Sequence, residues 1–316
     1  MKRIDVFGKS VQGASHKRTD MECQDSRRTV QFDDGTIILA VADGHGSKAC
    51  PYSKSGSSIA VNVFIKIMAG YLESYSDNPE MVLTFLNREG DTKVAQAVDT
   101  EWKKRVLKKH TDHKRNVSDD ENSEKDKVKI YSLYGTTLVG LVIFKTFIFA
   151  FQLGDGDIVY VDNNGVSPVI QNEKILGVET HSLSSINSWE KAMSTVRRME
   201  SGKRPPYVFM LSTDGFSNSY KNGNEFEKTC LEYFQMLNEH GADAVKSCLK
   251  NWLSETSEMG CGDDITLLIA YCSDGALCSK SKKAKSDVSN TRLVVEPLEA
   301  TCDETEVYPM SSTKFA

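Results

Sequence analysis

The sequence predicts an α+β fold in which strands and helices form separate layers. Apolar runs of strand length are grouped in three places along the chain: at 37–42, within 136–170, and in the pair 208–212 and 265–272. Helical periodicity occurs between these groups. Strands that cluster together, with helices between the clusters, are typical of α+β layered proteins.

The strands are predicted from short apolar runs bounded by turn residues. The run at 37–42 follows a hairpin turn at Asp34-Gly35, which joins it to a strand near 29–32. The middle group divides into 138–144, 147–153, 158–161 and 166–170, with turns at Lys145-Thr146, Asp155-Gly156 and Asn163-Asn164-Gly165. Such short connections predict an antiparallel meander.

Helices are predicted where apolar residues recur three or four positions apart, as in the stretch from Ile59 to Leu72. Further helical tracts lie near 93–108, 189–200, 224–239 and 242–257. The charged stretch at about 110–129 is predicted to be a solvated insertion loop. A Lys/Ser-rich and then acidic end predicts a disordered tail over 276–316, which leaves 1–275 as the folded domain.

The composition excludes several classes of protein. A chain of 316 residues with 39% hydrophobic residues can bury a full core, and a net charge of −5 gives no global basic field, so we expect no nucleic-acid partner. Eight scattered cysteines show no zinc-ligand spacing. The N-terminus has no apolar signal region, and Lys145 interrupts the most apolar window, so we expect a cytoplasmic protein that does not enter a membrane and is a monomer.

Three acidic positions stand at the ends of predicted strands. Asp43 follows the strand at 37–42 and is followed by a glycine-rich loop and a helix, and Asp214 has the same setting after 208–212. Asp263 and Asp264 begin the strand at 265–272. If that strand runs antiparallel to the other two, all of these acids meet at one rim of the sandwich.

Carboxylates gathered in one place repel one another unless a cation neutralises them. A set of oxygen ligands without cysteine or paired histidine suits Mg²⁺ or Mn²⁺ better than zinc. Glycine beside an acid allows a backbone carbonyl or a phosphate to approach closely. Judged by spacing alone, a metal site and ordinary Asp-Gly turns both remain open.

Six motifs in order give the chain a family resemblance. They are Gln24-Asp25, Asp43-Gly44-His45-Gly46, Gly135-Thr136-Thr137, Gly154-Asp155, Thr213-Asp214-Gly215 and Gly262-Asp263-Asp264-Ile265-Thr266. The set, spanning about 5–272, resembles the metal-dependent serine/threonine phosphatases called PPM or PP2C, and is most similar to their bacterial branch. The resemblance implies a four-layer α/β/β/α sandwich of two antiparallel sheets flanked by helices.

The resemblance also implies a set of metal ligands for two Mn²⁺ or Mg²⁺ ions, with a possible third. Asp43 resembles the acid that bridges two metals, and the Gly44 carbonyl resembles a ligand of one of them. Asp214 and Asp263 resemble the acids that hold the first metal, although Asp264 offers a competing choice. Asp25 resembles the acid that completes the set through bound water, although Glu22 offers a competing register. Asp155 would help to hold the third ion or would simply form a turn.

The mechanism implied by the resemblance uses no protein nucleophile. A hydroxide that bridges the two metals attacks phosphorus in line. His45 resembles the general acid that protonates the departing serine or threonine alkoxide; in isolation, it could equally be a turn histidine bonded to the backbone.

The chain departs from the family pattern at the phosphate-binding arginine, where it has Asp20. We predict Arg18 as the phosphate-binding residue, with Lys17 as the alternative and an exposed basic pair as the competing interpretation. Residues at about 171–206 occupy the place of the family's variable flap. The basic residues there could attract acidic phosphopeptides or simply belong to a solvated helix end: Arg197, Arg198, Lys203 and Arg204.

The sequence therefore predicts a protein-serine/threonine phosphatase whose partner is a phosphorylated protein. Two other hypotheses remain open. One is a non-catalytic module that binds phosphoproteins with the same fold, and the other is a phosphatase of small phosphoesters.

Overall fold

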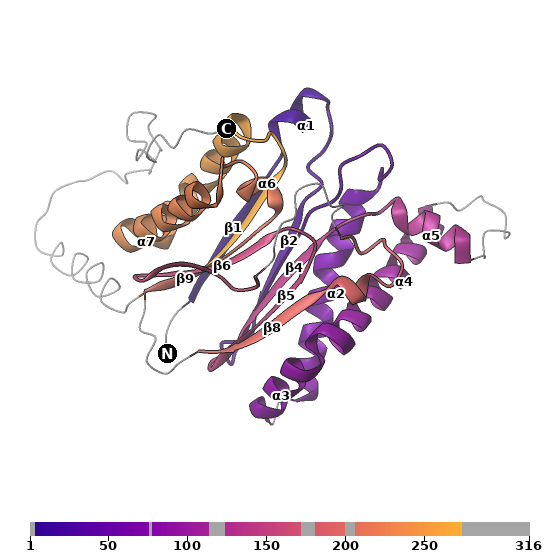
Figure 1. The fold of residues 1–316 in the computed structure, drawn as a ribbon, viewed down its shortest axis with the longest axis horizontal. Helices are drawn as coiled ribbons and strands as arrows, with labels where there is room; N and C mark the ends of the chain where they lie inside the picture. The colour runs from indigo at the N-terminus through magenta and orange to yellow at the C-terminus, as the bar shows by residue number, and fades with distance from the viewer. Residues whose placement is uncertain (1–3, 76–77, 114–123, 172–180, 200–205, 274–316) are drawn as a thin grey trace, which may run out of the picture.

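Two five-stranded antiparallel sheets form the centre of the protein (Figure 1). The structure is a computed structural model, and it describes residues 4–75, 78–113, 124–171, 181–199 and 206–273. The first sheet has the strand order β1 (Ile4–Val11), β10 (Ile265–Cys272), β9 (Tyr207–Ser212), β6 (Asp157–Asp162) and β7 (Gly165–Pro168). The second has the order β2 (Ser26–Gln31), β3 (Ile37–Ala42), β4 (Leu138–Ile143), β5 (Phe147–Leu153) and β8 (Met193–Arg198).

Helices cover the outer face of each sheet (Figure 1). The long helix α7 (Gly223–Met259) packs against β1, β6 and β10 of the first sheet. The helices on the second sheet are α2 (Ser53–Ser74), α3 (Pro79–Glu89), α4 (Ala95–His113) and α5 (Glu124–Ser132), with a π-helical turn at Gly90–Val94. Of these, α2 packs against β2, β3 and β4, α3 contacts β8, and α5 packs on α4. This arrangement confirms the predicted four-layer sandwich.

Alternation along the central strands explains their unbroken apolar runs. In β3, Ile37, Leu39 and Val41 face the first sheet, while Ile38 and Ala40 face the helices. Successive side chains of a strand point to opposite faces, and both faces are covered here. Every residue of β3 is therefore buried, as a continuous apolar run predicts.

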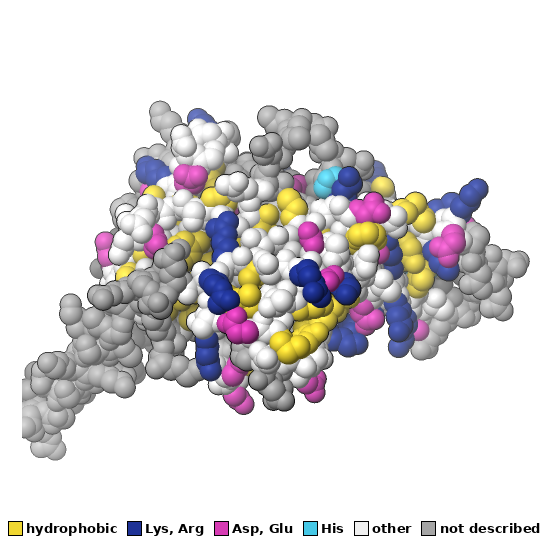
Figure 2. All heavy atoms as spheres, turned by 60° about the horizontal axis from the view of Figure 1, so that its bottom comes forward, with side chains coloured by type: hydrophobic (Ala, Val, Ile, Leu, Met, Phe, Trp, Pro, Cys, Tyr) yellow, Lys and Arg dark blue, Asp and Glu magenta, His cyan; other side chains and the backbone are white. Residues whose placement is uncertain are grey.

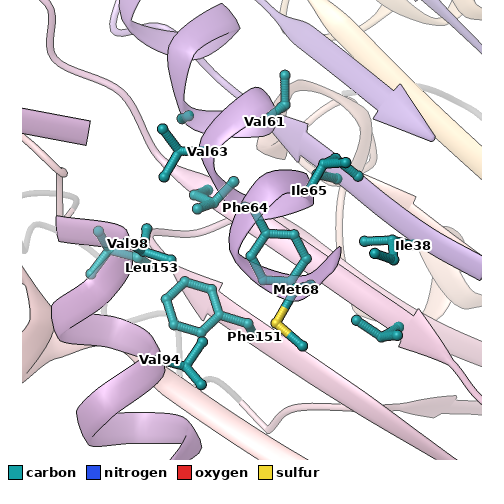
Figure 3. Close-up of a cluster of buried hydrophobic side chains, with 14 of the residues drawn as sticks. Ile38, Val61, Val63, Phe64, Ile65, Met68, Val94, Val98, Phe151 and Leu153 are labelled. Atoms are coloured by element: carbon teal, nitrogen blue, oxygen red, sulfur yellow. The ribbon is translucent and has the colours of Figure 1, made fainter. Parts of the chain in front are cut away.

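The helix layer packs closely on the second sheet (Figure 3). Phe64 of α2 contacts Phe151 of β5, with ring centroids 5.7 Å apart. A Cβ on Gly140 of β4 would lie 2.3 Å from the Phe64 ring, so this strand position requires glycine. Among the described residues, α2 is the one helix with the length and apolar content of a membrane span, but residues such as Phe64 and Met68 fill the core beneath the sheet.

Most predicted elements are present. The strands near 29–32, 37–42, 208–212 and 265–272 are confirmed, as are the four segments between 138 and 170. The two helical tracts at 224–239 and 242–257 are the halves of α7, which bends where Gly241 adopts φ +84°.

Three predictions about local structure are wrong. The tract at 189–200 is a short 3₁₀ helix, Ser188–Lys191, followed by β8, which pairs with β5 as an edge strand. Asp155-Gly156 does not close a hairpin, because β5 and β6 belong to different sheets and the chain crosses between them there. The predicted loop at 110–129 is helical at both ends, in α4 and α5, and its centre lies outside the described residues.

Three elements were not predicted: β1, α3 and the short helix α1 (Ala14–Arg18). β1 is an edge strand in which only Phe7 and Val11 are buried, so its sequence lacks the apolar run that marks the central strands. The predicted tail at 276–316 lies outside the described residues, as do parts of the flap-like region 171–206.

Candidate metal centre

The predicted acids gather at one end of the sandwich, where α1 and α6 (Asp214–Ser217) also lie (Figure 1). Asp43 follows β3, Asp214 follows β9, and Asp263 precedes β10, which runs antiparallel to β9. Burial raises the pKa of Asp43 well above its usual range, and the negative charges of Asp25, Asp214, Asp263 and Asp155 raise it further. Five acids distant in sequence therefore interact at one place.

Asp25 is the most deeply buried of these acids, with 1% of its surface exposed. The Thr213 hydroxyl donates a hydrogen bond of 2.7 Å to Asp25 Oδ2 and itself accepts one of 2.9 Å from the Thr266 N–H. Asp25 Oδ1 is buried without a hydrogen-bond partner. Burial is the largest cause that raises the pKa of Asp25 to about 7, and Asp264 and Asp214 add to it, while hydrogen bonding from Thr213 and Thr266 opposes the rise.

Asp263 and Asp264 have different environments. Asp264 is buried and accepts hydrogen bonds of 2.6 Å from the Gly13 N–H at Oδ1 and from the Gln24 N–H at Oδ2, so both of its oxygens hold the β1–β2 segment in place. The Asp263 side chain is 49% exposed and accepts a 2.8 Å hydrogen bond from the Asp264 N–H. Burial raises the pKa of Asp263 in spite of that bond. This difference favours Asp263 as the residue available to a ligand.

Backbone hydrogen bonds fix the loop that carries Asp43, Gly44 and His45. The Asp43 carbonyl accepts bonds from the Thr137 N–H at 2.9 Å and from the Thr136 hydroxyl at 2.6 Å. The His45 N–H donates to the Gly135 carbonyl at 3.2 Å. A Cβ on Gly135 would lie 2.6 Å from His45 Cδ2, so the imidazole ring packs against this glycine.

Glycines beside the acids permit contacts that a side chain would block. A Cβ on Gly44 would lie 2.8 Å from the carbonyl oxygens of both Gln24 and Ser53. A Cβ on Gly215 would lie 2.1 Å from the Asp264 carbonyl oxygen and 3.4 Å from Asp263 Cβ. The second close approach brings the start of α6 against the start of β10, and with it Asp214 near Asp263.

The structure places the other predicted residues less centrally. Arg18 ends α1 and is exposed, and no hydrogen bond or ion pair of its side chain is found in the described part of the chain. Arg197 and Arg198 belong to β8, where Arg198 pairs with Glu80 at 2.9 Å. Lys203 and Arg204 lie outside the described residues.

Sequence reasoning missed two basic residues of the site. His16 Nδ1 lies 2.9 Å from Asp264 Oδ1, and Lys54 Nζ donates to the Asp25 carbonyl at 2.8 Å. Lys54 had no visible signal, because it stands in the first turn of α2 without a motif. Thr213, by contrast, stands inside the motif Thr213-Asp214-Gly215, but this motif does not predict the hydrogen bond from Thr213 to Asp25.

The donor set fits a hard divalent cation. Within the described ranges, no three acidic, histidine or cysteine side chains are arranged tightly enough to hold an ion as they stand. However, burial and the neighbouring acids raise the pKa values of Asp25, Asp43 and Asp263, and Asp25 Oδ1 is buried without a partner. A cation would relieve both costs, because it neutralises charge and accepts lone pairs from carboxylate oxygens.

The raised pKa of Asp25 leads to a prediction about stability. A folded-state pKa near 7, above the usual value of about 3.9, means that Asp25 favours the folded state at low pH and that this contribution is lost as the pH rises from about 4 to about 7. Asp25→Asn should therefore raise the Tm of the metal-free protein at pH 8 by roughly 2–8 °C, and by much less at pH 5.

Thermal denaturation in EDTA at both pH values measures this effect. Asp33→Asn, in the exposed hairpin turn before β3, is the matched control and should change Tm little at either pH. With Mn²⁺ in excess, the order should reverse, because the wild type binds the ion more tightly. A wild type that is as stable as Asp25→Asn in EDTA at pH 8 would contradict the assigned environment.

The family to which the chain belongs is shown by comparison with known protein families. The model of the family described as protein phosphatase 2C matches residues 12–254, so the chain belongs to that family. A search of curated proteins gives no match.

Solved structures share the fold at low sequence identity. The catalytic domain of the serine/threonine protein phosphatase PstP, in complex with two manganese ions, is 15% identical with a TM-score of 0.52; the match covers 86% of this chain and 99% of that one. PppA, a regulatory component of type VI secretion in Pseudomonas aeruginosa, is 17% identical with a TM-score of 0.52, covering 85% and 97%. A C. elegans sex-determining protein is 15% identical with a TM-score of 0.55, covering 86% and 65%.

Proposed function

We propose that this protein is a Mn²⁺- or Mg²⁺-dependent phosphatase that hydrolyses phosphoserine or phosphothreonine in protein substrates. The observation that carries the proposal is the set of five mutually interacting acids, with one buried and unpartnered carboxylate oxygen, in a chain of the protein phosphatase 2C family. The two manganese ions in the PstP structure support the choice of metal.

Specific residues would hold the ions. Asp43, Asp214, Asp263 and the Gly44 carbonyl would bind two of them, with Asp25 completing the set, and Asp155 would help to hold a third. When bound, such ions lower the pKa of water so that it attacks phosphorus at neutral pH, and they neutralise charge on the phosphoryl oxygens. The chain's part is to fix these acids. The Thr213 hydroxyl donates to the Asp25 carboxylate, and the Thr136 hydroxyl donates to the main-chain carbonyl of Asp43.

His45 would act as the general acid. Its backbone is fixed to Gly135, its ring packs on the same glycine, and it stands two residues after Asp43 in the same loop. A serine or threonine alkoxide is a poor leaving group, so a proton from His45 to the departing oxygen would lower the barrier.

Metal-dependent turnover of a phosphothreonine peptide tests the proposal. We expect hydrolysis with Mn²⁺ or Mg²⁺ that disappears with EDTA and returns when the metal is added back. Absence of turnover over a range of both metals, together with phosphopeptide binding in calorimetry, would favour a non-catalytic binding module instead. Faster turnover of small phosphorylated metabolites than of phosphopeptides would favour a small-molecule phosphatase.

The partner of the proposed phosphatase is a phosphorylated protein and not nucleic acid. On the face shown in Figure 2, basic and acidic side chains are interspersed, with no extended patch of one sign. This face therefore offers no extended basic surface of the kind that binds nucleic acid. We also propose that the protein acts in the cytoplasm as a monomer, away from membranes.

A further inference from the structure

β1 has a strand partner on one side only, within the part of the chain that the structure describes. It pairs with β10 and is the last strand of the first sheet. β2 is likewise the last strand of the second sheet, and α7 packs on β1 (Figure 1). An edge strand presents a row of N–H and C=O groups to which a further strand can pair.

A groove runs along this edge of β1. Two hollows of about 310 and 260 Å³ adjoin each other, because Val6, Phe7 and Lys246 line both of them. Their walls come from β1, from β2 and from the second half of α7. The groove therefore lies between the edges of the two sheets, with α7 beside it.

The charge of the lining changes along the groove. Asp5 and Asp243 line the hollow that Ile4 also lines, whereas Lys9 and Arg27 line the other one. Within the described ranges, no ion pair is found for the three basic side chains of the groove: Lys9, Arg27 and Lys246. The second hollow therefore favours an occupant that brings a negative charge.

The two faces of β1 set a pattern for a further strand. Successive side chains alternate, so Asp5, Phe7 and Lys9 share one face. Phe7 belongs to the core beneath α7, whereas Ile4 and Val6 pack against the core between the sheets. A strand added here would place every second side chain toward α7 and the others toward the space between the sheets.

The chain itself contains a segment with this pattern. Residues 292–296, which lie outside the described ranges, read Arg-Leu-Val-Val-Glu and are followed by Pro297. The basic and acidic residues stand four positions apart, as Asp5 and Lys9 do. Val and Leu between them suit a strand, and proline would end it.

The position of β10 brings this part of the chain to the groove. β10 ends at Cys272, which pairs with Ile4 at the acidic end of the groove. Residues 274–291 would have to pass only from β10 to the far side of β1, two strand spacings or about 10 Å. A random coil of that length spans roughly 20–25 Å, so the connection is long enough.

We propose that residues 292–296 add to the edge of β1 as a strand parallel to it. Arg292 would lie beside Asp5 and Asp243, and Glu296 would lie beside Lys9, in the hollow that Arg27 and Lys246 also line. Leu293 and Val295 would face the space between the sheets. The antiparallel direction would place Arg292 against Lys9 and Glu296 against Asp5, so charge selects the parallel one.

Hydrogen–deuterium exchange of the full chain, read by mass spectrometry, tests this docking. The amides of 292–296 should exchange at least about 10-fold more slowly than those of a free peptide of the same sequence, because strand pairing protects them. Glu296→Lys and Lys9→Glu should each remove the protection, since either change brings like charges together. The double variant Lys9→Glu/Glu296→Lys should recover most of it, because the charges are again opposite.

Two further variants control for the change of charge. Glu306→Lys reverses an acid outside the segment, and Lys108→Glu reverses an exposed lysine on α4, in the helix layer of the second sheet. Both should leave the protection of 292–296 unchanged. Slow exchange of β3 shows that each variant is folded. If Lys9→Glu does not fold, the comparison of the wild type with Glu296→Lys decides, because Glu296 follows the domain predicted over 1–275.

Three outcomes would overturn the proposal. Exchange of 292–296 at the rate of the free peptide in the wild type would exclude docking. Protection that persists in both single variants would place the segment somewhere other than this groove. Protection that disappears on dilution, together with a dimer in sedimentation, would mean that the segment binds a second copy of the chain.

Discussion

Asp43→Asn is expected to lower the turnover of a phosphothreonine peptide by at least about 10³-fold at saturating Mn²⁺. Asparagine keeps the size of the side chain but removes the charge that would bind the ions. Burial and then the charges of four other acids raise the pKa of Asp43, so its carboxylate interacts with all of them. Asp214→Ala should cause a loss of similar size.

Steady-state rates over a Mn²⁺ titration provide the measurement. Asp34→Asn serves as the control, because Asp34 lies in an exposed turn at the far end of β3 from Asp43. Asp43→Asn should also bind Mn²⁺ more weakly than the wild type in calorimetry. Activity of Asp43→Asn within about 3-fold of the wild type would show that the Asp43 carboxylate is not required for the reaction.

His45→Ala is expected to reduce turnover of the same peptide by roughly 10²- to 10³-fold, and turnover of p-nitrophenyl phosphate much less. The difference arises because p-nitrophenolate is a good leaving group that needs no proton, whereas a threonine alkoxide has to be protonated as it leaves. The loss should fall on kcat more than on KM, since the proton is transferred only in the transition state.

The two substrates measured side by side separate acid catalysis from a loss of structure. His240→Ala changes an exposed histidine on α7 and should affect neither rate. Equal losses on both substrates would mean that His45 supports the loop or binds substrate and does not deliver the proton.

The central strands could be predicted from the sequence because they are buried on both faces. An apolar run such as β3 carries that information in its own residues. The edge strands β1 and β8 do not, since one side of each meets solvent and their sequences mix polar and apolar residues. The sequence of β8 predicts a helix, and only its pairing with β5 shows that the segment is a strand.

The meeting of the acids could also be predicted, because it depends on strand direction alone. Once β9 and β10 run antiparallel, Asp214 at the end of one and Asp263 at the start of the other share an edge. The position of His16 depends instead on a contact with Asp264, which lies nearly the whole chain away in sequence. Nothing in the local sequence reports such a contact. The assignment of phosphate binding to Arg18 stays a prediction, and its side chain is exposed in the structure.

Anomalous X-ray scattering from crystals grown with Mn²⁺ tests the central claim most directly. The account predicts two manganese peaks at the end of the sandwich, with carboxylate oxygens of Asp43, Asp214 and Asp263 within about 2.0–2.6 Å of them. Crystals that diffract well at millimolar Mn²⁺ but show no peak near these residues, or peaks only elsewhere, would contradict it.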